Sequence, residues 1–565
     1  MNNRTLPLLV CSLLVCSLLL ACGPESTPDA GPTPAATTTT PPEPATHPGG
    51  PLPADRGQFF SASGACSACH TQMIDQAGND VSTDEFWRGS IMANASRDPY
   101  WRAAVRAEVL AHPAYTAVIE DKCTTCHTPM ARFTDAEAGS QGKMLDDGYA
   151  SAGHPLHVLA LDGVSCNLCH QIREEGLGAV DSFSGGYLID VELPAGERDA
   201  FGPYPVADQL AQIMQGSSGF VPRESPHVDL SELCATCHTL YTPFIDAAGE
   251  IAGEFPEQMP YVEWQHSSYR DHVSCQDCHM PLARGGVQLS ITGGPQREPF
   301  FQHVFVGGNV YMLEVLKTYG ADLQVTASQA HFEDKQARTL EQMQTRTAAV
   351  VVDEATLDGS TLTASVLVAN RTGHKLPTGF PSRRVWLHVT VADAAGQVVF
   401  ESGAPGPDGA IAGNDNDADA AAYEPHYDLI DSPDQVQVYE AIMGDTEGTV
   451  TTTLLKGAGY LKDNRLLPLG FDKTTADPDV GVYGAALDDA DFEGAADRVR
   501  YVIDVADAPG PFTVTARLLY QSVAYRWADN LRRHDAPEPA AFVTYYDQVP
   551  NDPVVVSTAS LEVAQ

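Results

Sequence analysis

The sequence predicts a multidomain α+β protein, in which a region of short helices and loops precedes an antiparallel β-sandwich. Three observations support this prediction. Five Cys-x-x-Cys-His motifs fall between about residues 60 and 340, a stretch that lacks long strand-like runs. From about residue 347 the chain has no cysteine and shows segments in which apolar residues alternate. At 565 residues, it is also too long for one hydrophobic core.

The first residues predict export. Arg4 precedes an apolar run, Leu6 to Leu20, which is too short to span a bilayer and is typical of a signal peptide. The run leads into Ala21-Cys22-Gly23, which resembles the lipobox of bacterial lipoproteins, in which Cys22 becomes the acylated N-terminus. Because Gly23 rather than aspartate follows, the resemblance implies the outer membrane, at its periplasmic face or the cell surface. An ordinary secretory peptide is the alternative.

Composition divides the chain into four segments. We expect a signal peptide over residues 1–21 and a Pro/Thr-rich disordered tether over 22–55, which has too few large apolar side chains to fold. The motif-bearing domain should cover 56–345 and the β-sandwich 346–565. A formal net charge of −41 argues against nucleic acid as a partner and suits basic redox proteins.

The motifs account for the cysteines. Of 13 cysteines, Cys11 and Cys16 belong to the signal peptide and Cys22 to the lipobox. The rest form five pairs, each followed at once by a histidine: Cys66, Cys69 and His70; Cys123, Cys126 and His127; Cys166, Cys169 and His170; Cys234, Cys237 and His238; Cys275, Cys278 and His279. No cysteine is left for a structural disulfide.

This spacing is suited to covalent haem attachment. Two thiols at this separation reach the two vinyl groups of a porphyrin, and the adjacent histidine is placed to ligate the iron. Zinc ribbons need an even number of pairs and no fixed histidine, and a thioredoxin-like motif would occur once. We therefore expect five covalently bound haem c groups. A body of this size has a radius of gyration of about 19 Å, so the haems must be neighbours.

Each iron can take a second axial ligand, usually histidine or methionine. The candidates with the best sequence context are His227, His303 and His374, together with His154 or His157. His374 lies in a turn-rich loop, 370–379, between two strand patterns, and its ring could reach a haem of the preceding domain. Weaker candidates are His112, His266, His272 and His331.

Met92 is a further candidate ligand. It lies in a predicted helix from Phe86 to Ala111, whose buried face would also carry Trp87, Trp101 and Val105. A buried core methionine is the alternative. As a ligand, Met92 would raise the potential of its haem relative to sites with two histidines.

Several segments resemble the multihaem cytochromes related to the tetrahaem cytochrome of ammonia oxidisers. The resemblance spans about residues 60–545 and includes FWRGSIMANASRDPYW, LDGVSCNLCHQI and PYVEWQHSSYRDHVSCQDCHMP. That family commonly has Trp-x-x-Ser-x-His-Ala with the histidine as a distal haem ligand, whereas Met92 and Tyr269 stand at this position here. The loop around His374 looks like one in larger bacterial cytochromes with an appended β-domain. The resemblance implies electron transfer, and some relatives act on small nitrogen compounds.

The C-terminal region is expected to be the sandwich. Seven segments read as strands: 361–370, 384–393, 397–401, 434–443, 450–455, 498–505 and 512–523. The acidic loop 414–419 could bind Ca²⁺ through oxygen ligands, although it lacks the Gly and distal Glu of an EF-hand. A solvated loop is the alternative. His388 and His426 are expected to be structural or exposed.

Three functions are compatible with these features. A pentahaem cytochrome that relays electrons at the cell envelope is favoured over a substrate-converting enzyme, and no catalytic residue is predicted. The second is a multihaem oxidoreductase that acts on a small nitrogen or sulfur compound at one open haem. The third is a docking or assembly subunit of a larger electron conduit.

Overall fold

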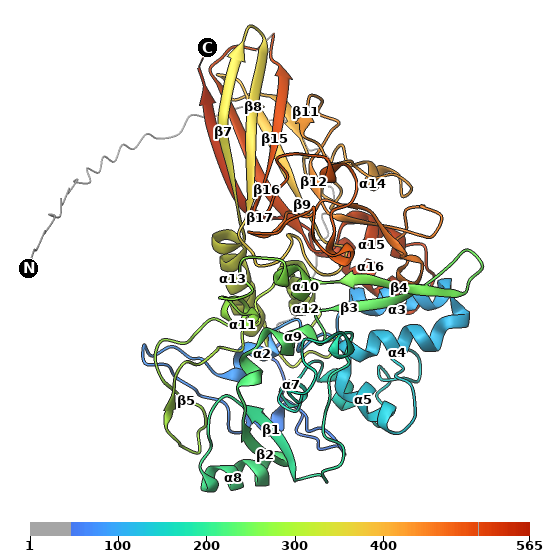
Figure 1. Ribbon diagram of the computed structural model, residues 1–565, viewed down its shortest axis with the longest axis vertical. Helices are drawn as coiled ribbons and strands as arrows, with labels where there is room; N and C mark the ends of the chain where they lie inside the picture. The colour runs from blue at the N-terminus through green and yellow to red at the C-terminus, as the bar shows by residue number, and fades with distance from the viewer. Residues whose placement is uncertain (1–46, 507, 565) are drawn as a thin grey trace, which may run out of the picture. The chain divides into compact units, whose positions relative to one another are not determined.

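The computed structural model describes residues 47–506 and 508–564. The predicted signal peptide, Cys22 and most of the predicted tether lie outside these residues. The described chain is an α+β protein, with helices and short strands before residue 348 and long strands after it (Figure 1). None of the helices in the described ranges has both the length and the apolar character that crossing a membrane requires.

The motif-bearing region consists of short helices joined by long loops. The Cys-x-x-Cys pairs start in α1, α4, α7, α9 and α11, so a helical turn presents both thiols of each pair. The helices are α1 (Gly64–Ser67), α2 (Thr83–Arg88), α3 (Pro99–Ala111), α4 (Thr116–His127), α5 (Pro129–Glu137), α6 (His157–Leu161), α7 (Cys166–Cys169), α8 (Asp208–Ser218), α9 (Ser231–Ala235), α10 (Pro260–Gln265), α11 (Cys275–His279), α12 (Val310–Thr318) and α13 (Gln329–Gln342).

Three small two-stranded sheets interrupt these helices. They are the parallel pair β1 (Arg198–Gly202) and β2 (Phe220–Glu224), and the antiparallel pairs β3 (Leu240–Ile245) with β4 (Ile251–Gln258) and β5 (Val287–Gln288) with β6 (Gln296–Arg297).

The single helix predicted over 86–111 is wrong. The chain forms α2 and then α3, separated by turns between Arg88 and Pro99. The Asp98 carboxylate caps α3 by accepting hydrogen bonds from the backbone N–H groups of Tyr100 and Trp101, at 2.8 and 3.2 Å. Asp at the N-cap and Pro at the first helical position favour a new helix start here.

Two mostly antiparallel sheets form the C-terminal region (Figure 1). One has the order β10-β9-β16-β17 with β12 also on β9, and the other β11-β15-β8-β7. The strands are β7 (Ala348–Asp358), β8 (Thr361–Asn370), β9 (Arg384–Ala392), β10 (Val398–Ser402), β11 (Leu429–Ile430), β12 (Val438–Tyr439), β13 (Ala441–Gly444), β14 (Gly459–Asp463), β15 (Ala496–Asp504), β16 (Phe512–Gln521) and β17 (Val554–Val563). Helices α14 (Asp415–Ala418), α15 (Tyr525–Leu531) and α16 (Pro537–Gln548) flank them.

Most predicted strands are confirmed, and β8 matches its predicted range. The segment 434–443 is divided between β12 and β13, and the strand predicted over 450–455 is wrong, since η5 (Leu454–Lys456), a 3₁₀ turn, ends it. The strands β7, β11, β14 and β17 of this region were not predicted.

The motif region and the strands share hydrophobic cores. Met259 and Val262 of the motif region pack into the same buried cluster as Leu387 and Val514 of the sandwich. Beside α3, the Tyr100 ring meets Phe542 of α16, with 5.3 Å between ring centroids. The described residues therefore belong to one compact unit.

The described chain begins at His47, within the predicted tether, which was expected to extend to residue 55. The His47 ring lies 2.8 Å from the carbonyl oxygen of Val325, and the Gly50 N–H donates to the carbonyl of Thr326. These long-range hydrogen bonds hold the end of the Pro-rich segment against the motif region.

Candidate haem sites

Four of the five motif histidines are oriented by the same kind of hydrogen bond. Nδ1 of each ring faces a backbone carbonyl oxygen: Leu289 for His70 at 2.7 Å, Ala95 for His127 at 3.0 Å, Phe201 for His170 at 2.5 Å and Val306 for His279 at 2.6 Å. A neutral ring that donates from Nδ1 keeps the lone pair of Nε2 free. This is the usual arrangement of metal-ligating histidines.

Burial keeps the motif imidazoles neutral. Loss of solvent lowers the pKa of all five motif histidines, to about 4 for His127 and His238. The His127 ring also stacks flat on Trp101, with 4.3 Å between centroids and 1° between planes. Neutral imidazole is the form that binds a metal, so these rings are ready to ligate iron.

Two of the predicted distal histidines face motif histidines. The His303 ring is nearly parallel to that of His170, with centroids 6.3 Å apart and 16° between planes. His374 faces His279 in the same way, at 6.2 Å and 20°. A metal bound to imidazole lies about 2 Å from the nitrogen, and each ring adds roughly 1 Å to its centroid, so two imidazoles on one iron should have centroids about 6 Å apart. Both pairs fit this separation.

The rings of the two predicted distal histidines are also oriented by a hydrogen bond between Nδ1 and a backbone carbonyl oxygen. Nδ1 of His303 lies 3.1 Å from the carbonyl oxygen of Phe301, and Nδ1 of His374 lies 2.9 Å from that of Lys375. Burial lowers the pKa of His303 to about 3 and that of His374 to about 4. Each distal ring is therefore neutral with Nε2 free, and the residues fit an iron porphyrin between each pair.

A buried charge network supports the His374 loop. Glu263 of α10 accepts a hydrogen bond from the Lys375 N–H at 3.1 Å and pairs with Arg465 at 2.8 Å. Asp463 pairs with the Lys375 ammonium at 2.8 Å and with Arg465 at 2.7 Å. Although burial alone would raise it, the Arg465 and Lys375 charges lower the pKa of Asp463 to about 2. The loop that carries His374 is thus fixed from both the motif region and the sandwich.

The structure distinguishes His157 from His154. Nδ1 of His157 lies 2.8 Å from the carbonyl oxygen of Tyr149, which leaves Nε2 free. Nδ1 of His154 instead accepts a hydrogen bond from the Leu156 N–H at 3.2 Å, so Nε2 carries the proton in a neutral ring. Of the two alternatives, this geometry favours His157 as a ligand.

His227 is fully buried, and both of its ring nitrogens are engaged. Nδ1 lies 2.7 Å from the Ser225 hydroxyl, and Nε2 lies 2.8 Å from the carbonyl oxygen of Ile172. Ligation by His227 would require one of these hydrogen bonds to break. It stays a prediction.

The weaker candidates also stay predictions. Nδ1 of His331 accepts from the Ser328 N–H, and its Nε2 contacts Glu85. His266 pairs with Asp477 at 3.3 Å, and His272 is exposed. Nε2 of His112 is buried without a hydrogen-bond partner among the described residues, and Met92 is half-buried.

Thiol contacts bring the motifs together. The thiols of Cys66 and Cys166, of Cys126 and Cys237, and of Cys234 and Cys275 are close enough that the members of each pair affect one another's pKa. All ten motif cysteines are free of disulfides. The first motif is therefore next to the third, and the fourth touches both the second and the fifth.

An open slot lies at the first motif. Cys66, Cys69 and His70 form part of its wall, and mostly apolar residues of 204–218 and 289–297 form the rest. The slot has a volume of about 130 Å³ and opens to solvent, so it is smaller than the ~300–1,000 Å³ typical of closed cofactor and ligand pockets. The chemistry of its wall, two thiols, an imidazole and apolar side chains, is that of a porphyrin attachment site.

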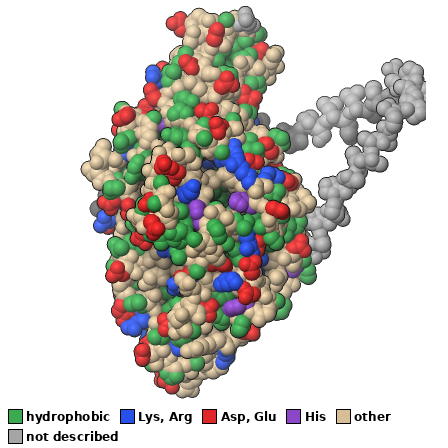
Figure 2. Space-filling view, turned by 90° about the vertical axis from the view of Figure 1, so that its right-hand side faces the viewer, with side chains coloured by type: hydrophobic (Ala, Val, Ile, Leu, Met, Phe, Trp, Pro, Cys, Tyr) green, Lys and Arg blue, Asp and Glu red, His purple; other side chains and the backbone are tan. Residues whose placement is uncertain are grey.

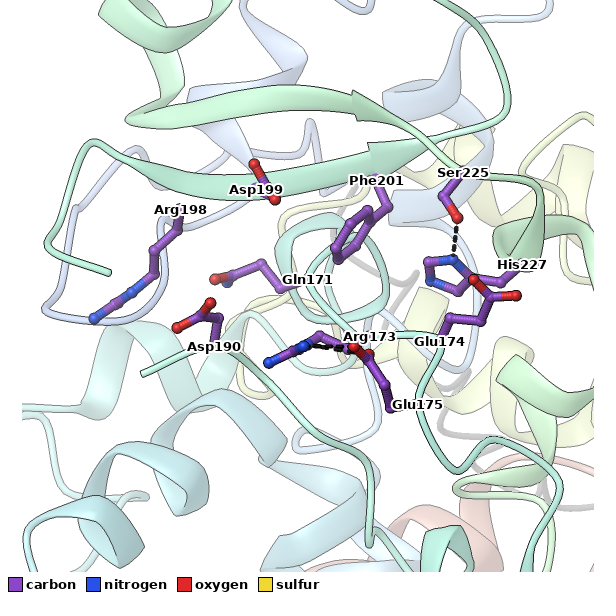
Figure 3. A pocket seen from close by; sticks show the side chains of 10 residues that line it. All are labelled: Gln171, Arg173, Glu174, Glu175, Asp190, Arg198, Asp199, Phe201, Ser225 and His227. Atoms are coloured by element: carbon purple, nitrogen blue, oxygen red, sulfur yellow. Dashed lines mark hydrogen bonds and ion pairs between the residues drawn. The ribbon is translucent and has the colours of Figure 1, made fainter. Parts of the chain in front are cut away.

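A second pocket, of about 420 Å³, lies near the third motif and is polar. Figure 3 shows Arg198 and Asp190 toward one end of it, Arg173 near its middle and His227 at the other end. Phe201, whose carbonyl faces Nδ1 of His170, also lines it. Because no motif cysteine is in its wall, this pocket is not an attachment site.

The predicted calcium loop is largely occupied by internal contacts. Asp417 pairs with buried Arg384 at 2.8 Å and accepts a hydrogen bond from the Ile411 N–H. Calcium binding here stays a prediction.

A cluster of His426, Asp489 and Asp497 lies elsewhere in the sandwich. Nδ1 of His426 accepts from the amides of Gln437 and Asn464, so Nε2 carries the proton and donates to Asp489 at 3.0 Å. With the proton on Nε2, His426 has a structural role, as predicted.

No family model matches the chain, and no curated protein does. One solved structure, a penta-haem cytochrome c552 from Thermochromatium tepidum, has 16% sequence identity and a TM-score of 0.47, covering 88% of this chain and 97% of that one. This similarity is too low to establish a common fold or function.

Proposed function

We propose that this protein is a pentahaem c-type cytochrome that transfers electrons. The observation that carries the proposal is the facing of a motif imidazole and a second imidazole at two sites, His170 with His303 and His279 with His374. When bound, haem iron supplies a one-electron couple. The proposal agrees with the resemblance to the multihaem cytochromes related to the tetrahaem cytochrome of ammonia oxidisers.

Different residues of the chain would attach the haems, ligate the iron and orient the ligands. The ten motif cysteines would form the thioether attachments, and each of the five motif histidines would supply one ligand to iron. The carbonyls of Leu289, Ala95, Phe201 and Val306 accept from Nδ1, which orients each ring and raises its basicity as a ligand. His303 and His374 would supply second ligands to the iron at the third and fifth motifs and would so keep substrates and water from it.

The arrangement of the motifs supports a relay. Thiol contacts join the first motif to the third and the fourth to the second and fifth, so the attached groups would be neighbours. The net charge of −41 favours basic redox proteins as donor and acceptor. On the face shown in Figure 2, acidic side chains are spread widely, and histidines appear beside a hollow at mid-height.

The location is part of the proposal. Cys22 would carry the lipid after removal of residues 1–21, and the Pro/Thr-rich tether would hold the folded part near the outer membrane. Mass analysis of the N-terminal peptide tests this: a diacylated or triacylated Cys22 supports the anchor, and an unmodified N-terminus at another residue overturns it.

Spin-state spectroscopy tests electron transfer as the function. We expect resonance Raman and electron paramagnetic resonance spectra of the purified holoprotein to show six-coordinate low-spin iron throughout. A reductive titration should then show the haems being reduced in successive steps. Separate activity assays should show no turnover of nitrite, hydroxylamine or sulfite.

One observation favours a second candidate, a multihaem oxidoreductase that acts on a small nitrogen or sulfur compound. Among the described residues that line the slot at the first motif, His70 is the sole imidazole. An iron there with no second ligand would be open to substrate. A high-spin signal that disappears on addition of cyanide or nitrite would support this function over electron transfer.

A further inference from the structure

At the third and fifth motifs a second imidazole faces the motif histidine, but at the first motif none does among the residues that line the slot. Nδ1 of His70 is fixed by the Leu289 carbonyl, which leaves its Nε2 free, as in His127, His170 and His279. Within the described part of the chain, however, no second imidazole lines the slot. Besides the two motif thiols, the slot contains one other sulfur ligand, the thioether of Met214.

Met214 is presented by one face of α8. Leu210, Ile213, Met214 and Ser217 all line the slot, and their spacing of three and four residues places them on the same side of the helix. Ile213 is 46% exposed although it is a large apolar side chain, and Met214 is half-buried. This apolar face is therefore directed at the slot rather than into the protein core.

The end of α8 that carries Met214 is tied to the segment preceding the first motif. The buried Ser61 hydroxyl donates to the Ser218 carbonyl at 3.0 Å, and Arg56 donates to the Gly216 carbonyl at 3.4 Å. The Gln215 amide also donates to the Gly196 carbonyl at 2.6 Å. Gly219, at φ 86°, ends the helix in the left-handed conformation that glycine adopts readily. These contacts anchor the C-terminal half of α8, which carries Met214, beside the first motif.

We propose that Met214 is the second axial ligand at the first motif, opposite His70. The inference rests on the proposed function, because it requires a haem attached at Cys66 and Cys69. A thioether is a common partner of histidine on haem iron, and it raises the reduction potential relative to two histidines. Electrons that enter at the third or fifth site would then move toward the first.

The test compares holoprotein variants Met214→Ala and Met214→His with Met92→Leu, which changes the other candidate methionine. The readouts are the near-infrared charge-transfer band of thioether-ligated ferric haem, the redox titration, and the haem count by intact mass. We expect the wild-type protein and Met92→Leu to show the band. Met214→Ala should lose it and gain one high-spin haem, and Met214→His should lose it, stay low-spin and titrate at a lower potential at one haem.

Persistence of the band in both Met214 variants would overturn the proposal, as would a wild-type spectrum without the band. Because Met214→His supplies a replacement ligand, it remains informative if Met214→Ala is poorly produced. The haem count separates the two proposals. A wild-type count below five counts against the proposed function itself, whereas five haems without the band reject only Met214.

Discussion

Backbone carbonyl oxygens orient the rings of His303 and His374. Each ring is neutral and uses Nδ1 on a nearby backbone carbonyl, and each ring centroid lies about 6 Å from that of a motif imidazole, the separation that one shared metal requires. Ligation therefore needs little rearrangement of either side chain.

Replacing His374 by alanine should convert one haem to a high-spin state without loss of covalent attachment, because Cys275 and Cys278 are unchanged. Resonance Raman spectroscopy and intact mass measure the two effects. The matched control is His272→Ala, since His272 is exposed and precedes the same motif. If every iron stays low-spin in His374→Ala, the ligand assignment is wrong.

Glu108 gives a prediction on pH. Burial raises its pKa to about 7, although it accepts hydrogen bonds from the N–H groups of Leu454 and Leu455. Since this value lies above the ~4.3 of an unfolded Glu, the protonated carboxyl favours the folded state, and its contribution is lost as pH rises through about 7.

We therefore expect Glu108→Gln, which keeps an acceptor oxygen without the charge, to have a higher Tm than the wild-type protein at pH 8, by a few degrees. The difference should shrink by pH 5, where Glu108 is protonated. Scanning calorimetry at both values measures it, and an equal difference at pH 5 and pH 8 would contradict the pKa assignment.

The sequence predicted the motif residues because thioether chemistry fixes their spacing. It also singled out His303 and His374, by the loops that contain them. It could not identify the carbonyls of Leu289, Phe201 and Val306, because a backbone acceptor leaves no side-chain signal. Met214 was also missed, since it is one helix residue among many until α8 is placed against the first motif.

At the scale of elements, one short segment serves two sites. Residues 303–306 supply the His303 ring to the third site and the Val306 carbonyl to His279 of the fifth. Lys335 of α13 donates to the carbonyl of Phe305 at 2.9 Å, and Phe305 has a φ of 51°, unusual for a bulky residue. Burial lowers the pKa of Lys335 to about 7. The lysine therefore holds a segment on which two imidazole pairs depend.

Lys335→Met should loosen this segment, because the Phe305 carbonyl loses its donor. We expect changes in the electron paramagnetic resonance signals of two haems, the third and the fifth, and a lower Tm. Arg338→Met, on the more exposed side of the same helix, serves as the control. A spectrum identical to that of the wild-type protein would show that Lys335 has no such role.

Elements were predicted where a single periodicity dominates. The alternating run of β8 was predicted at its full length, and β9, β15 and β16 within one or two residues. The helix break at Asp98–Pro99 was missed because the apolar spacing continues across it, although the capping signal was present in the sequence. The strand β17 was missed because it pairs with β16 through a long-range contact that local pattern does not reveal.

At the scale of the whole molecule, the sandwich and the motif region belong to one body. The sandwich supplies His374 and shares buried clusters with the motif region, and the network of Glu263, Lys375, Asp463 and Arg465 joins the two. The sequence predicted two domains but not this junction. Glu263 and its partner Lys375 are more than a hundred residues apart, and no local pattern reveals such a contact.

Asp463→Asn should destabilise the whole chain, since it leaves Lys375 and Arg465 buried with one carboxylate fewer. Breaking a buried ion pair costs about 3–5 kcal/mol. The expected results are a lower Tm and a fraction of high-spin haem from release of the His374 loop. Asp431→Asn, at an exposed carboxylate of the same region, should change neither. Equal Tm values for Asp463→Asn and wild type would show that the network does not hold the junction.

The central claim is that five porphyrins are covalently bound, one at each Cys-x-x-Cys-His motif. The intact mass of the purified chain under denaturing conditions tests it most directly. We predict a mass that exceeds that of the polypeptide by five haems, with colour that remains on the protein after acid–acetone extraction. A colourless chain whose mass equals that of the polypeptide alone would contradict the account.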